Sequence, residues 1–356
     1  MDDIGALLVP LVVAIAAVVV AVWLTTRAPG LGRKARPGGH RTRPGAISGR
    51  RRGRRRSRRQ TKPRYGVEEL AQRLGLDPAE LGSVRASYRH FTVPKRSGGS
   101  RLITAPDDAT KRLQRRILHR LLDRLPAHPA AHGFELGRSI VTNAVAHERA
   151  AVILKLDVRD FFGATKASRV RRYFRVVGWD RDAAKILTRL TTWDGGLPAG
   201  APTSPRLANL VNVMLDARLA GLAAREGATY TRYADDLTFS FSNDDGATVR
   251  RVIRVARSIL WAERYELHLA RKLQVRRRWE RQLVTGLVVN DRARLPRRRR
   301  RWLRAVEHRA TVGRPMTISP EALAAWHGLE LMVESKAAEQ RAAAATTHGS
   351  RPDSGE

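Results

Sequence analysis

The sequence predicts an α+β protein that follows an N-terminal membrane anchor and an Arg-rich linker. Residues 4–24 contain no charged side chain, and the next 40 residues contain 16 cations and no acid. From residue 65 onward, helix-like and strand-like patterns alternate. We expect a transmembrane anchor at 1–24, a disordered linker at 25–64, a folded body at 65–295, a helical C-terminal region at 296–345 and a disordered tail at 346–356.

The composition limits the class of protein. The chain has 356 residues, with 68 Lys and Arg against 33 Asp and Glu, a formal net charge of +35 and no cysteine. The absence of cysteine excludes disulfides, thiolate zinc sites and a cysteine nucleophile. The charge favours a polyanionic partner, either nucleic acid or an anionic membrane surface. Only 9 of the 68 cations are Lys, so biased coding can account for part of the Arg excess.

The uncharged segment at residues 4–24 is long enough to cross a bilayer, because 21 helical residues extend about 30 Å. A cleaved signal peptide is the alternative, but Asp2 and Asp3 are acidic where a signal peptide has cations. The cations after the segment place that flank in the cytoplasm. We therefore expect a single-pass membrane protein with a cytoplasmic body. The linker could contact anionic lipid or nucleic acid, or serve only to set the topology.

Within the body, hydrophobic periodicity locates the main elements. A buried strand is expected at 151–156 and a β-hairpin at 229–233 and 237–241, with Ala234, Asp235 and Asp236 in its turn. Another strand is expected at 284–289. Helices are expected at 67–74, 78–86, 109–125, 204–226, 248–264, 296–310 and 320–344.

Carboxylates follow two of these strands. Asp157 ends the apolar run, and Asp235 and Asp236 lie together at the hairpin tip. Burying or crowding carboxylates costs free energy unless a cation meets them. Two Mg²⁺ ions held by carboxylates from separate strands would relieve this cost and suit displacement at phosphorus. Asp-Asp also occurs at 2–3, 107–108 and 244–245, so the flanking strands, and not the dipeptide, distinguish 235–236.

Four segments, in this order, resemble the motifs of reverse transcriptases. They are 93–103 (VPKRSGGSRLI), 157–162 (DVRDFF), 196–205 (GLPAGAPTSP) and 233–236 (YADD). The resemblance covers about residues 65–310. It implies a right-hand polymerase with fingers, a palm built on an antiparallel sheet, and a thumb.

Two further segments resemble elements of retron reverse transcriptases. These are Asn143-Ala-Val-Ala-His147 and Val284-Thr285-Gly286. A retron-type enzyme would copy a partner non-coding RNA into a short DNA joined to that RNA (msDNA), in anti-phage defence with a separate effector protein. Another defence-associated or intron-type reverse transcriptase remains an alternative, as does a non-catalytic, membrane-bound RNA scaffold.

The resemblance also implies roles for individual residues. Asp157, Asp235 and Asp236 would hold two Mg²⁺ ions and be catalytic. The residues expected to bind the incoming dNTP are Lys95, Arg101, Phe162, Gly200 and Lys272, with Phe162 as a steric gate against ribonucleotides. The residues expected to bind RNA or template are Asn143, His147, Thr285, Arg298, Arg301 and Trp302.

Simpler interpretations exist for several of these residues. Lys95 and Arg101 could belong to a basic surface hairpin, and Phe162 and Trp302 could be core residues. A single histidine such as His147 is more often a surface or capping residue than an RNA contact. The sequence departs from the family pattern at Ala199, where relatives commonly have Gln, which removes a side-chain hydrogen bond from that position.

Overall fold

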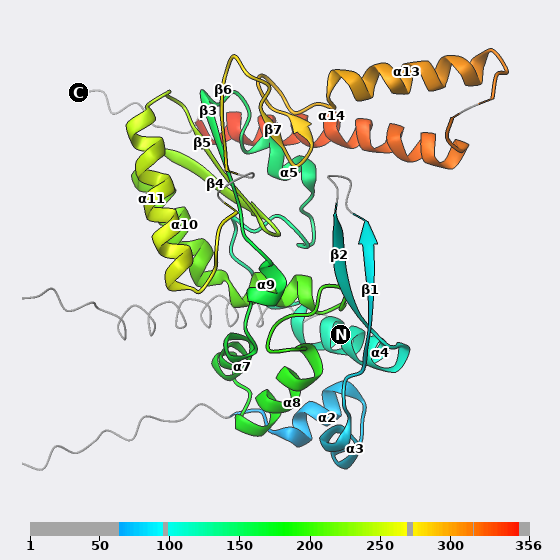
Figure 1. Ribbon diagram of the computed structural model, residues 1–356, viewed down its shortest axis with the longest axis vertical. Coiled ribbons are helices and arrows are strands. Elements are labelled where there is room, and N and C mark those ends of the chain that lie inside the picture. Colours follow the sequence, from blue (N-terminus) through cyan, green and yellow to red (C-terminus); the bar gives the residue numbers. More distant parts are fainter. Residues whose placement is uncertain (1–63, 95–98, 269–272, 316, 349–356) are drawn as a thin grey trace, which may run out of the picture.

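The computed structural model describes residues 64–94, 99–268, 273–315 and 317–348 (Figure 1). The expected anchor, nearly all of the expected linker, Lys95 and Lys272 lie outside these ranges. Of the helices within them, none is by itself long and apolar enough to cross a membrane. The consecutive helices Ser204–Val211 and Val213–Arg225, bent by 55°, meet the length and composition criterion only as a pair.

A four-stranded antiparallel sheet lies at the centre of the molecule (Figure 1). Its strand order is β4-β5-β3-β6. The strands are β3 (Val152–Asp157), β4 (Ala228–Tyr233), β5 (Asp236–Phe241) and β6 (Gln274–Arg277). The predicted strand and hairpin are confirmed to within one residue at each end. An antiparallel sheet with helices fits the expected polymerase fold.

Strand β3 has apolar side chains on both faces, because helices cover both sides of the sheet. Val152, Leu154 and Leu156 belong to the cluster formed with helices α10 (Val213–Arg225) and α11 (Gly246–Ala262). Ile153 instead packs with α5 (Ile140–Val145), the segment around residues 283–295 and α14 (Pro320–His348). Figure 1 shows the sheet between these two groups of helices.

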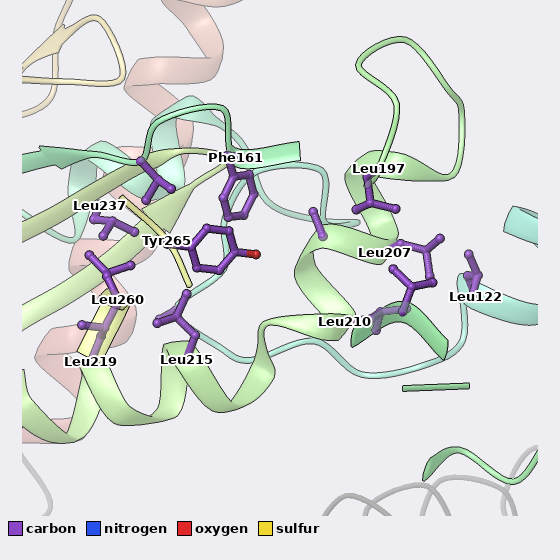
Figure 2. Packing of buried hydrophobic residues seen from close by; sticks show 14 of the residues in the cluster. Leu122, Phe161, Leu197, Leu207, Leu210, Leu215, Leu219, Leu237, Leu260 and Tyr265 are labelled. Carbon is purple, nitrogen blue, oxygen red and sulfur yellow. The ribbon is translucent and has the colours of Figure 1, made fainter. Parts of the chain in front are cut away.

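The larger cluster extends beneath the end of the sheet (Figure 2). The Tyr265 ring stacks on Phe161 with centroids 5.6 Å apart, and Leu215 and Leu237 lie beside it. Its hydroxyl makes a 2.6 Å hydrogen bond with that of Thr165. Tyr265 therefore contacts both the segment after β3, through Phe161 and Thr165, and helix α10, through Leu215.

The N-terminal part of the body combines helices with a separate hairpin. Strands β1 (Tyr88–Pro94) and β2 (Ser100–Pro106) pair antiparallel and are mostly exposed. Around and below them lie α2 (Val67–Leu74), α3 (Pro78–Ser83), α4 (Asp108–Ile117), the π-helix η1 (Leu118–Leu122), α6 (Phe161–Ala164), α7 (Ala167–Val176), α8 (Arg181–Thr191) and α9 (Ser204–Val211).

The C-terminal part contains a short hairpin and two helices. Strands β7 (Leu283–Val284) and β8 (Leu287–Val288) precede α13 (Arg297–Thr311) and α14. Helices α13 and α14 pack through Trp302 and Trp326, whose ring centroids are 6.0 Å apart.

The helix expected at 78–86 ends at Ser83, and three further predicted elements differ in kind from the structure. The helix expected at 204–226 is two helices, because Asn212 leaves the helical conformation. The side-chain amide of Asn212 donates hydrogen bonds to the Ala208 carbonyl and to the Tyr265 hydroxyl. The helix expected at 109–125 ends in the π-helix η1. The single strand expected at 284–289 is wrong: Thr285 and Gly286 both have positive φ and form the two-residue turn between β7 and β8.

His147 lies just after α5 and is 1% exposed. Its Nδ1 is 2.7 Å from the Ser240 hydroxyl on β5, and its Nε2 is 2.7 Å from the Thr231 hydroxyl on β4. Both ring nitrogens are therefore occupied inside the protein. The expected RNA contact by His147 does not fit this position, because the ring fastens α5 to the sheet instead.

His147 should make stability depend on pH. Burial, with a contribution from His132, lowers the pKa of His147 to about 3. The unfolded chain binds this proton below about pH 6.5 while the folded protein does not, so the free energy of unfolding should fall as the pH drops from about 6.5 toward 3, by up to about 1.4 kcal/mol per pH unit. Urea unfolding at a series of pH values measures this slope.

The control compares two histidine substitutions. His147→Gln should reduce the slope of the unfolding free energy with pH, leaving the part due to His132, whose pKa burial lowers to about 4, whereas replacing the exposed His308 by Gln should not reduce it. Equal slopes for wild type and His147→Gln would contradict this account.

Candidate active site

The expected catalytic carboxylates meet at one end of the sheet. Asp157, the last residue of β3, lies directly opposite Asp236, the first residue of β5. The Val158 amide donates a 3.0 Å hydrogen bond to the Asp235 carbonyl. Ala234 and Asp235 form a two-residue turn between β4 and β5, with Ala234 at φ 56°. Two segments almost 80 residues apart in sequence thus bring three aspartates to one edge.

Basic side chains flank these carboxylates. The Lys155 Nζ is 3.9 Å from a carboxylate oxygen of Asp236, and the His268 Nε2 is 3.9 Å from one of Asp157. The backbone amide of His268 also donates to the Asp157 carbonyl at 2.9 Å. His268 therefore borders the site, a residue that the sequence did not single out.

Carboxylates are the ligands that a hard divalent cation prefers. In the described part of the chain, no group of three or more His, Cys, Asp or Glu side chains is gathered as a ready-made metal cluster. Mg²⁺ usually takes only one or two protein carboxylates and completes its shell with water and substrate phosphates. The paired positions Asp157 and Asp236, with Asp235 adjacent, fit a site of that kind.

A fully buried ion pair supports the hairpin that presents Asp235. Arg232, on β4, binds the Asp216 carboxylate through two nitrogens, at 2.8 and 2.6 Å, and both side chains have no exposed surface. Its remaining nitrogen donates to the Asn209 side chain at 3.0 Å and to the Ala234 carbonyl at 3.2 Å. Burial opposes the guanidinium charge, but Asp216 outweighs it and raises the pKa of Arg232. Arg232 thus links the turn to α10.

The loop before α5 approaches the same hairpin. His132 donates its amide to the Arg232 carbonyl at 2.8 Å, and the Arg232 amide donates to Ala130 at 2.7 Å. A Cβ on Gly133 would lie 2.8 Å from the Ala234 nitrogen, so only glycine fits there without displacement. The Asn209 amide donates to the Gly133 carbonyl at 2.7 Å. Gly133 and Arg232 are positioning residues that the sequence did not single out.

Phe162 lies in an aromatic group beside the end of the sheet that carries Asp157, Asp235 and Asp236, called the carboxylate edge below. Its ring centroid is 6.4 Å from that of Phe134, which in turn is 6.2 Å from Tyr233, the residue before the turn. Phe134 is 48% exposed and has φ 63°. Phe162 also contacts the core ring of Phe161 at 5.8 Å. The position of Phe162 fits both a contact with an incoming nucleotide and partial core packing. Phe134 was not among the residues that the sequence predicted for the nucleotide site.

Gly200, expected to bind the incoming dNTP, lies in close contact with the backbone of strand β2. With φ 136°, its added Cβ would lie 2.9 Å from the Thr104 carbonyl on β2. The neighbouring Ala199 carbonyl accepts a 2.9 Å hydrogen bond from the Thr104 amide. Gly200 therefore lets the 196–205 segment dock on the β1–β2 hairpin, and position 199 makes this contact with its backbone. Arg101 lies exposed on β2 of the same hairpin.

Other expected RNA contacts divide into buried and exposed residues. Asn143 is 1% exposed within α5, and the Thr285 hydroxyl donates to the Ile140 carbonyl at 2.7 Å. These two elements therefore pack on each other. Trp302 packs on Trp326, with the Arg299 guanidinium over both rings, which favours its interpretation as a core residue.

Arg298 and Arg301 remain accessible on α13. Their side chains lie on the solvent-facing surface of the helix, so contact with a phosphate backbone stays a prediction for both.

Breaking the buried pair should destabilise the protein. Asp216→Asn leaves the Arg232 charge without its partner in the core, which should cost about 3–5 kcal/mol of unfolding free energy. Urea denaturation measures the loss. The control, Asp244→Asn, removes a partly exposed pair with Arg277 and should cost less than about 1 kcal/mol. Similar losses in both variants would contradict the role given to Arg232 and Asp216.

Comparison with known proteins identifies the family. Residues 93–276 match the family described as reverse transcriptase (RNA-dependent DNA polymerase), which is more than half of the chain. The retron Mx162 reverse transcriptase of Myxococcus xanthus is 39% identical over 289 residues, covering 70% of this chain and 59% of the relative. The retron Mx65 reverse transcriptase of the same organism is 42% identical over 277 residues, covering 69% and 64%.

A third relative matches over most of its length. The retron Ec86 reverse transcriptase of Escherichia coli is 34% identical over 274 residues, covering 75% of this chain and 83% of the relative. The chain spans less than two thirds of the two Myxococcus relatives. The matched family region includes β3, β5 and the turn between β4 and β5. This chain belongs to the reverse transcriptase family, in its retron-type branch.

Proposed function

We propose that the chain is an RNA-directed DNA polymerase that copies a partner non-coding RNA into a short DNA joined to that RNA. The observation that supports this most strongly is the pairing of Asp157 with Asp236, with Asp235 in the adjoining turn. Membership of the retron-type branch supports the choice of template and product. The substrates are dNTPs and the RNA.

The residues at and around the carboxylate edge have different proposed roles. Asp157, Asp235 and Asp236 would hold two Mg²⁺ ions beside the primer end. When bound, these ions lower the pKa of the primer hydroxyl and neutralise the triphosphate and the leaving pyrophosphate. Arg101 suits a bidentate contact with phosphate oxygens. The Arg232–Asp216 pair keeps the turn in place, so that little reorganisation is needed during reaction.

Neutralising one carboxylate tests the polymerase activity. Asp235→Asn should lower Mg²⁺-dependent dNTP incorporation on a primed RNA template by about a hundredfold or more, because metal ions supply several kcal/mol of transition-state stabilisation. RNA affinity should stay within about twofold, since one carboxylate is removed from a strongly basic surface.

The matched control is Asp244→Asn, which changes an aspartate in another Asp-Asp dipeptide, away from the carboxylate edge. It should retain incorporation. If the wild-type chain incorporates no dNTP but binds RNA, the protein is a non-catalytic RNA-binding scaffold.

Phe162 is proposed as the steric gate. Its place beside Tyr233 and Phe134 supports this role. Phe162→Val should raise the kcat/KM ratio of rNTP to dNTP about tenfold or more, because the smaller side chain leaves room for a 2′-hydroxyl. Single-nucleotide incorporation assays measure the ratio. An unchanged ratio with intact dNTP incorporation would assign Phe162 to packing alone.

The retron product distinguishes this proposal from an intron-type or another defence-associated enzyme. Nucleic acid that copurifies with the chain should contain DNA joined to RNA through a 2′ linkage, so debranching should separate the two strands. A role in anti-phage defence with a separate effector follows as a proposal from the same family resemblance. Linear DNA alone would favour the alternative enzymes.

Membrane attachment through residues 4–24 is a separate proposal, supported by their 21 uncharged positions. Deleting residues 1–64 should leave dNTP incorporation intact, because the paired strands and their supporting helices all lie after residue 64. The deletion should move the protein from the membrane pellet to the supernatant on fractionation. A truncated protein that stays in a carbonate-washed pellet would contradict the anchor.

A further inference from the structure

Helices α7 and α8 enclose a cationic cleft of about 530 Å³. Five of its seven lining residues are cations and only one is an acid. The lining residues are Ser168, Arg171, Arg172, Arg175, Arg181, Asp182 and Lys185. None of them belongs to the residues expected to bind metal, nucleotide or template.

Within the described part of the chain, no side chain pairs with the cations of the cleft. Among the described residues, none of the five takes part in an ion pair or a side-chain hydrogen bond. The Arg175 Nε is buried and lacks a hydrogen-bond partner. A buried donor without a partner costs about 1–3 kcal/mol, and a bound anion would remove this cost.

The spacing within each helix increases the repulsion. Arg171 and Arg175 are four residues apart on α7, and Arg181 and Lys185 are four apart on α8. Like charges at this spacing face each other and destabilise a helix by about 0.2–0.5 kcal/mol per pair. The cleft brings both pairs to one concavity. A polyanion there would turn this repulsion into attraction.

Another arginine on α7 shows the contrast. Arg169 contacts the Glu263 carboxylate at 3.3 Å and donates to the Asn212 side chain at 2.9 Å. The cations of the cleft have no such partners among the residues that the structure describes, although acidic residues pair with arginines elsewhere on the surface, as Glu226 does with Arg251.

We propose that the α7–α8 cleft binds the phosphate backbone of RNA, at a second site apart from the carboxylate edge. The lining contains no aromatic ring on which a base could stack, so it suits phosphate contacts without sequence readout. Figure 1 shows α7 and α8 at the opposite end of the molecule from α13 with its arginines. A structured RNA that contacts both the α7–α8 cleft and α13 would extend across the folded body. This inference rests on the proposed function, because the RNA bound is the partner that carries the template.

The test removes three exposed cations from the cleft. The variant Arg171→Gln/Arg172→Gln/Lys185→Gln keeps helix-forming side chains at exposed positions. The probe is a fluorescein-labelled RNA hairpin with a fully paired stem, titrated at several KCl concentrations. Each phosphate contact contributes about 0.9 to the slope of log K against log salt, so the variant should lose about 2 to 3 from the slope and bind about 10- to 100-fold more weakly at about 0.1 M salt.

The matched control is Arg250→Gln/Arg254→Gln/Arg257→Gln, which removes the same charge from exposed positions on α11. It should keep the wild-type slope to within about one unit. Equal losses in the two triple variants would assign the effect to overall charge and overturn the proposal. An unchanged slope in the cleft variant would also overturn it.

Two further measurements distinguish RNA from other anionic ligands of the cleft. If inorganic pyrophosphate protects Arg171 and Arg172 from phenylglyoxal while the RNA hairpin does not, the cleft takes a small phosphate and the RNA assignment fails. The assignment also fails if the cleft variant loses binding only to phosphatidylserine vesicles.

Incorporation of dNTPs on a short single-stranded template should be unchanged in the cleft variant. If even the wild-type protein incorporates no dNTP, the proposed polymerase function is wrong. The RNA titration still decides the role of the cleft.

Discussion

The antiparallel pairing of β3 with β5 is the constraint on which the site depends. It sets Asp157 opposite Asp236 and leaves Asp235 in the turn. Because side chains alternate between the faces of a strand, a slip of one residue would move Asp157 to the opposite face of the sheet from Asp236 and turn Lys155 toward the apolar layer of Leu154 and Leu156. Such a slip is costly because it would bury the Lys155 ammonium among apolar side chains. Core packing and carboxylate geometry are therefore specified together.

Polar groups in the core extend this constraint to the turn. The buried pair of Arg232 and Asp216 connects β4 to α10 and reaches the Ala234 carbonyl. On the other face, His147 bonds to hydroxyls of β4 and β5. The two segments typical of retron enzymes thus help to build the layer beneath the sheet, and their contribution to RNA binding would act through the position of neighbouring elements.

Local patterns in the sequence predicted much of this arrangement. Alternation around Asp235 indicated a hairpin, and an apolar run ending in Asp157 indicated a buried strand. The ion pair between positions 216 and 232, the fit of Gly133 against Ala234 and the burial of His147 depend on contacts between distant segments, which no local pattern encodes. The bend at Asn212 likewise depends on Tyr265, more than 50 residues away.

Metal binding tests the central claim most directly. Mn²⁺ can be titrated into the purified chain with a primed RNA template and a non-hydrolysable dNTP, and followed by electron paramagnetic resonance. If β3 and β5 hold the metal ligands together, the wild-type chain should bind Mn²⁺ and Asp157→Asn should bind it at least about tenfold more weakly. Equal Mn²⁺ affinity in the two proteins, with the dNTP analogue bound to both, would contradict the account.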